Sequence, residues 1–106
     1  MKFKVVMVNE TPNGAVVSGR FSPDPNDESE KIGLPIMVEE LQTIPAFTDK
    51  MVTNSRQDTI LFKSVEVGLL KDQLAHLSNV LEFNLEYVPA KNYCSDPELY
   101  KKYFSI

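Results

Sequence analysis

Aromatic side chains stand beside basic side chains at several points of this chain. Exposed rings can stack on nucleic-acid bases while lysine and arginine follow the phosphates, so such neighbours are typical of surfaces that bind single strands. The neighbouring groups are Lys2-Phe3-Lys4, Arg20-Phe21, Phe62-Lys63 and Tyr100-Lys101-Lys102-Tyr103. Phe3 and Phe62 lie in strand-like runs, where a ring more often belongs to the core. The candidate nucleic-acid contacts are therefore Lys4, Arg20, Phe21, Lys63 and Lys91.

Catalytic and metal-binding patterns are weak in comparison. The only histidine, His76, falls on the polar side of a helical stripe, and the only cysteine, Cys94, has no CxxC partner. Neither residue belongs to a nucleophile motif or to a zinc ligand set. The acidic loop from Asp24 to Glu30 offers oxygens at alternate positions, but it lacks the glycine and the closing glutamate of a calcium loop. We expect no enzyme activity, no metal and no cofactor.

The charge of the chain is unevenly distributed. The 106 residues carry a net charge of −4, with −6 in residues 22–49 and +2 in the remainder. An excess of two positive charges is far below the basic stripe that phosphate binding normally shows. The length fits one domain, and a single cysteine without an apolar leader or spanning segment leads us to expect a cytoplasmic protein with no membrane partner.

Apolar periodicity in the first half predicts strands. Residues 3–8 and 15–21 are β-prone runs, and Asn13-Gly14 between them supplies the positive φ angles of a tight hairpin turn. Residues 22–31 have the composition of a loop. Residues 32–38 alternate apolar and other side chains, and Pro35 makes this run an edge strand or a bulged one. Residues 39–57 predict at most a short helical turn before Pro45, followed by an exposed loop.

The second half predicts two strands and two helices. Residues 59–67 are β-rich, with a change of phase at Lys63-Ser64 that a bulge would explain. The leucines of residues 69–77 recur at helical spacing. The segment from Val80 to Lys91 alternates strictly and predicts a closing strand that Pro89 ends. Ser95-Asp96-Pro97-Glu98 then predicts a helix start, and we expect that helix to dock on the chain or on a partner.

The closing strand also carries a family resemblance, in the residues Leu85-Glu86-Tyr87-Val88-Pro89-Ala90-Lys91. With the expected strand order, it resembles the OB-type single-stranded DNA-binding proteins of filamentous phages, the gene V type. The resemblance implies a dimeric barrel that coats single-stranded DNA without sequence preference and serves phage DNA replication. The acidic loop, the negative net charge and the added terminal helix depart from that family.

The sequence thus predicts a mainly β fold, a small OB-like barrel of about five strands with one or two short helices. Residues 1–92 would form the barrel and residues 93–106 a helical extension, docked on the barrel or on a partner. The expected function is sequence-independent binding of single-stranded DNA, in a possible homodimer. The alternative is an interaction protein of a phage or mobile element. It would bind a host protein through the acidic segment from Asp24 to Glu40 or the helix from Leu99 to Phe104.

Overall fold

The computed structural model describes residues 1–54, 59–90 and 96–104 of the chain. Its elements follow in the order β1 (Lys2–Thr11), β2 (Gly14–Ser22), α1 (Glu28–Gln42), α2 (Pro45–Thr48), β3 (Met51–Thr53), β4 (Ile60–Glu66), α3 (Val67–Leu81), β5 (Glu86–Pro89) and α4 (Pro97–Phe104). The described residues contain no helix with the length and apolar character needed to cross a bilayer.

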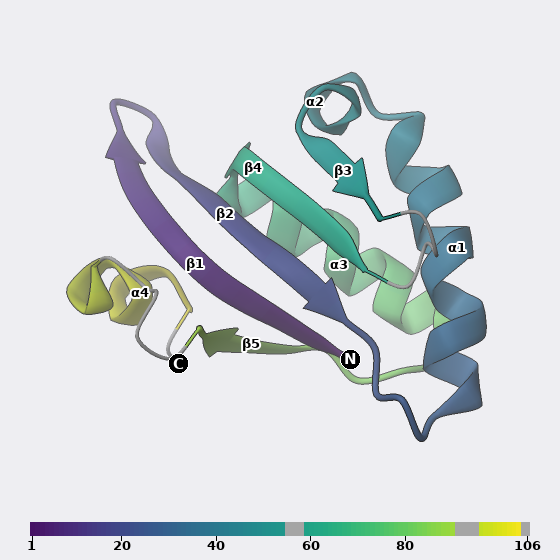
Figure 1. Ribbon diagram of the computed structural model, residues 1–106. Coiled ribbons are helices and arrows are strands. Elements are labelled where there is room, and N and C mark those ends of the chain that lie inside the picture. Colours follow the sequence, from purple (N-terminus) through teal and green to yellow (C-terminus); the bar gives the residue numbers. More distant parts are fainter. Residues whose placement is uncertain (55–58, 91–95, 105–106) are drawn as a thin grey trace.

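The five strands form one mixed sheet in the order β3-β4-β2-β1-β5. β5 runs parallel to β1, and the other neighbours are antiparallel. β3 and β5 are therefore the two edges, and these two described strands do not pair with each other (Figure 1). The expected barrel is not confirmed, because a barrel requires its first and last strands to close the ladder. The fold is an open β-sheet with helices.

The hairpin of β1 and β2 forms where the sequence predicted it. The register pairs Thr11 with Gly14, and Gly14 has a φ of 142°, which an L-residue with a side chain rarely adopts. A register shift between Val5 and Met7 leaves one extra residue on β1 and bends this strand. The expected bulge on β4 is also present: Ser64 has a φ of 52°, and its N–H bonds the Ser18 hydroxyl at 2.9 Å.

Residues 32–38 form a helix, and the expected edge strand is wrong. They belong to α1, whose N-terminus is capped by Asp27: its carboxylate accepts bonds from the N–H groups of Ser29 and Glu30. The buried positions Leu34, Met37 and Leu41 recur at i, i+3 and i+7, the spacing of one helical face. Pro45 begins α2, in the first-turn position that proline tolerates.

The described part of the predicted closing strand, residues 80–90, contains the end of a helix, a short connection and a short strand. α3 continues to Leu81, and Glu82 ends it in the left-handed conformation with a φ of 57°. Only Glu86–Pro89 pairs with β1. The long closing strand is therefore wrong, and only its last four residues before Ala90 form a strand. The expected helix at residues 69–77 is confirmed as the middle of α3.

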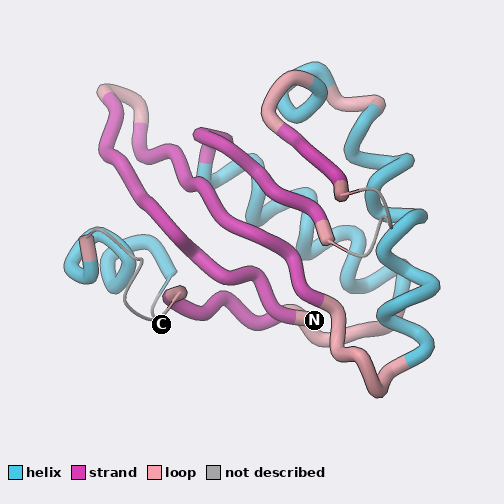
Figure 2. Tube along the Cα trace, viewed as in Figure 1, coloured by secondary structure: helices cyan, strands magenta, loops and turns pink. Residues whose placement is uncertain are grey.

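The core lies on one side of the sheet. Phe3, Phe21 and Phe62 on neighbouring strands are completely buried, with ring centroids 4.9 to 6.2 Å apart. α3 lies across this side, whereas α1 and α4 lie beside the two edges (Figures 1 and 2). Among the described residues no helix covers the opposite side, which we call the uncovered face.

Candidate nucleic-acid interface

Two of the expected contact residues face each other on the uncovered face. Lys4 on β1 and Arg20 on β2 are direct register partners, and both side chains are exposed. Directly opposite residues have Cβ atoms about 4.5–5.5 Å apart, and like charges in such a pair are destabilising. Neither side chain forms an ion pair with any residue that the structure describes. An anion bound between them would relieve their repulsion.

Two further lysines extend this positive charge. Lys2 precedes Lys4 by two residues and lies on the same side of β1, about 6.6 Å further along the strand. Lys63 on β4 is a diagonal neighbour of Arg20, whose direct partner on that strand is Leu61. We call Lys2, Lys4, Arg20 and Lys63 the basic cluster. It runs obliquely across three adjacent strands of the uncovered face.

Outside the basic cluster, the uncovered face carries serine, aliphatic and acidic side chains, with Ser18 and Ser22 on β2. Glu86 is the register partner of Lys2, and Glu66 lies at the far end beside Val16. One row across the sheet reads Val52, Leu61, Arg20, Lys4 and Val88 from β3 to β5. The positive charge is therefore central, with aliphatic side chains on either side of it.

Phe21, the expected stacking residue, is not on this face. Its side chain is completely buried, and its ring packs edge-on against Phe3 at a centroid distance of 4.9 Å. The alternation of β2 that exposes Arg20 necessarily buries Phe21. All the aromatic residues within the described strands, including Tyr87, lie on the core side. Phe21 is therefore wrong as a contact, and Lys91 lies outside the described residues.

A cavity adjoins the uncovered face near the first residue. It measures about 470 Å³ and is lined by Lys2, Lys4, Asp24, Asn84 and Glu86, among others. Cations and carboxylates both line it, so it lacks the single sign of charge that a phosphate pocket requires. We therefore place the candidate interface on the open sheet and not in this cavity.

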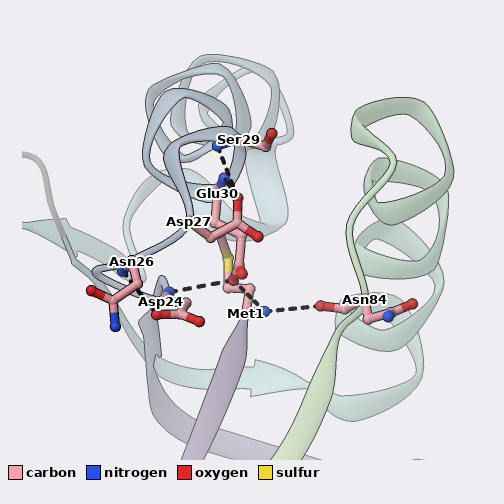
Figure 3. Close-up of polar contacts among 7 residues, drawn as sticks. All are labelled: Met1, Asp24, Asn26, Asp27, Ser29, Glu30 and Asn84. Atoms are coloured by element: carbon pink, nitrogen blue, oxygen red, sulfur yellow. Dashed lines mark hydrogen bonds and ion pairs between the residues drawn. The ribbon is translucent and has the colours of Figure 1, made fainter.

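Polar contacts beside the cavity tie the start of β1 to α1 (Figure 3). The Met1 ammonium pairs with the Glu30 carboxylate, which is only 6% exposed, and donates to the Asn84 carbonyl oxygen at 2.9 Å. Asp24 accepts a bond from the Asn26 N–H at 2.9 Å, and Asp27 caps α1. The Asp24 and Asp27 carboxylates thus accept backbone N–H bonds, and the Glu30 carboxylate, in the first turn of α1, forms the ion pair with Met1. They hold in place the strand end that carries Lys2.

The C-terminal helix lies against the chain's own sheet. The Tyr100 hydroxyl donates to the Tyr87 carbonyl oxygen at 2.8 Å, and Lys71 donates to the Tyr103 carbonyl oxygen at 2.9 Å. Phe104 is 8% exposed, and its ring lies 5.3 Å from that of Tyr87. Burial raises the pKa of Tyr87 to about 12, with a smaller contribution from the charge of Asp72. The apolar side of this helix is thus occupied within the chain.

An ion pair closes the same contact at the tip of the hairpin. Lys102 donates to the Glu10 carboxylate at 2.6 Å. This hydrogen bond and the charge of Lys102 hold the pKa of Glu10 below its usual value. The pair connects α4 to the end of β1. Because both side chains are exposed, it adds little to the free energy of unfolding.

Sequence reasoning therefore identified the exposed cations of the uncovered face but not the aliphatic side chains around them. Lys4, Arg20 and Lys63 share one face, as the strand alternation indicated. Lys2 belongs with them, and its spacing of two from Lys4 was the available signal. Val52 was missed because residues 39–57 predict no strand. Val88 was missed because the residues that share its face in the predicted closing strand, Glu82 and Glu86, are acidic.

Comparisons of this chain with protein-family models, with curated proteins and with solved structures find no match.

Proposed function

We propose that the uncovered face binds the sugar-phosphate backbone of single-stranded nucleic acid without sequence preference. The observation that carries the proposal is the Lys4–Arg20 register pair, two exposed like charges placed opposite each other without an anionic partner among the described residues. Lys2 and Lys63 supply a cation on each side of the pair.

The mechanism is electrostatic, because the described strands place no aromatic side chain on this face. A strand of phosphates crossing β1, β2 and β4 would release counterions from up to four contacts. Aliphatic side chains such as Leu61 and Val88 would touch sugars and bases without selecting among them. Glu66 and Glu86 at the two ends would repel phosphates and limit the strand to the central part of the sheet.

The proposal is tested by fluorescence anisotropy with labelled oligo-dT in 50 mM salt. The double variant Lys4→Gln/Arg20→Gln should bind at least about tenfold more weakly than the unaltered chain, since it loses two phosphate contacts. The matched control, Lys31→Gln/Lys101→Gln, removes the same charge from α1 and α4, where each lysine pairs with a glutamate one turn away.

The control should bind oligo-dT within about twofold of the unaltered chain. Both double variants lose two positive charges, so any effect of net charge is common to them. Equal losses in the two double variants would mean that the attraction is a property of total charge and not of this face. Absence of binding by the unaltered chain at 50 mM salt would refute the proposal outright.

A further inference from the structure

The solvent side of α1 carries two large apolar side chains. Ile32 is 66% exposed and Ile36 is 42% exposed, although both lie in the middle of the helix. They are four residues apart and therefore adjacent on one side of the helix. Leu34, Met37 and Leu41 form its buried side. We call Glu28, Ile32, Ile36, Glu39 and Glu40 the α1 ridge.

The stability of the helix itself does not account for this ridge. Isoleucine is a weaker helix former than leucine, and here it is exposed twice. Glu39 and Glu40 lie at the C-terminal end, where the helix dipole disfavours negative charge and where no basic residue is present. Pro35 interrupts the hydrogen-bond ladder in the helix interior. Departures from local rules of this kind are expected at functional sites.

The charge around the two isoleucines indicates what covers them. Glu28, Glu39 and Glu40 are exposed, and the only basic residue of α1, Lys31, already pairs with Glu28 at 3.2 Å. Glu39 and Glu40 form no ion pair with the described residues. A second copy of the chain would bring like charges together at this ridge, whereas a cationic segment would pair with them.

We propose that the α1 ridge docks an amphipathic, basic helix of a partner protein. The apolar side of that helix would pack against Ile32 and Ile36. Side chains four residues apart form a row that fits into the groove of a neighbouring helix. Lysine or arginine side chains beside that apolar side would reach Glu39 and Glu40. The pairing thus combines a small apolar centre with a charged rim, the usual anatomy of an interface.

This docking surface is separate from the basic cluster. α1 lies beside the β3 edge of the sheet, whereas the basic cluster lies on β1, β2 and β4 (Figure 1). The inference therefore does not rest on nucleic-acid binding, and Ile32→Thr/Ile36→Thr, which keeps the net charge, should leave oligo-dT affinity unchanged.

The test uses a synthetic 18-residue helical peptide with leucine on one side and lysine on the other, and a matched peptide with glutamate in place of lysine. Binding is measured by calorimetry at low salt. Ile32→Thr/Ile36→Thr should weaken binding of the basic peptide at least tenfold. Glu39→Gln/Glu40→Gln should weaken it about fivefold and reduce its salt dependence. Val80→Thr, an exposed valine in α3 outside both proposed surfaces, is the control and should bind within twofold of the unaltered chain.

Each contrary outcome has a defined meaning. Equal binding of the glutamate peptide, or retention of affinity in both ridge variants, would overturn the proposal. Sedimentation that shows a dimer abolished by Ile32→Thr/Ile36→Thr would assign the ridge to a second copy and also overturn it. Circular dichroism and urea unfolding of each variant would establish that these exposed substitutions leave the fold intact.

Discussion

Among the glycines, Gly19 is the position at which substitution by alanine should lower the free energy of unfolding most. A Cβ atom at Gly19 would lie 2.5 Å from the Lys4 carbonyl oxygen and 2.8 Å from two ring carbons of Phe3. Real Cβ contacts are almost never below 3.0 Å, and one of these neighbours is backbone of the adjacent strand. Gly19→Ala must therefore displace β1 from β2. Overpacking of a core typically costs about 1–3 kcal/mol, and we expect about 3 kcal/mol here because a ladder is displaced as well.

Two other glycines supply matched controls for the same chemical change. A Cβ at Gly33 in α1 would meet its nearest atom at 3.5 Å, and one at Gly68 in α3 at 3.7 Å, both ordinary contacts. Alanine should stabilise each helix by up to about 1 kcal/mol. Urea unfolding of the three variants measures the contrast. If Gly19→Ala unfolds at the same urea concentration as Gly33→Ala, the close packing of β1 on β2 described here is wrong.

Two further perturbations address a half-buried tyrosine and a buried carboxylate. Tyr87 has a raised pKa in the folded chain, so the stability it contributes is complete below pH 10 and is lost as the pH rises toward 12. Urea unfolding at pH 9 and at pH 11.5 measures this loss of unfolding free energy. We expect the loss to be about 1–2 kcal/mol smaller in Tyr87→Phe, a value reduced for the partial exposure of the ring. Identical pH profiles of the two proteins would contradict the prediction. Glu30→Gln leaves the Met1 ammonium without its buried counter-charge. In protein with a free Met1 amino group it should lower the unfolding free energy by about 3–5 kcal/mol, and a loss below 1 kcal/mol would show that the pair is solvated.

The sequence predicted correctly those features that depend on neighbouring residues, namely a turn, a helix start and the exposed side of two strands. Asn13-Gly14 specified a hairpin, and Asp96 with Pro97 specified the start of α4, where the Asp96 carboxylate accepts a bond from the Leu99 N–H at 3.1 Å. The positions of Lys4 and Arg20 followed from strand alternation alone. These features depend on residues only a few positions apart, so the sequence contains all the information they require.

The errors arose where two periods fit the same residues. Ile32, Leu34, Ile36 and Val38 satisfy a period of two, yet Leu34, Met37, Val38 and Leu41 satisfy the helical period that the chain adopts. Tertiary burial decides between these patterns, and it exposes both isoleucines. The closed barrel, which the open sheet does not confirm, went beyond local signals for a similar reason. Strand order depends on contacts between distant segments, and the parallel pairing of β5 with β1 has no local signal.

The slope of oligo-dT affinity against salt concentration tests the proposed interface most directly. With four phosphate contacts, log Kobs should fall with log salt at a slope of about −2.8, and affinity should drop about 50-fold between 50 and 200 mM salt. Lys4→Gln/Arg20→Gln should reduce the slope to about −1.4, because two of the four contacts are removed. An unchanged slope in that variant would contradict the assignment of phosphate binding to the uncovered face.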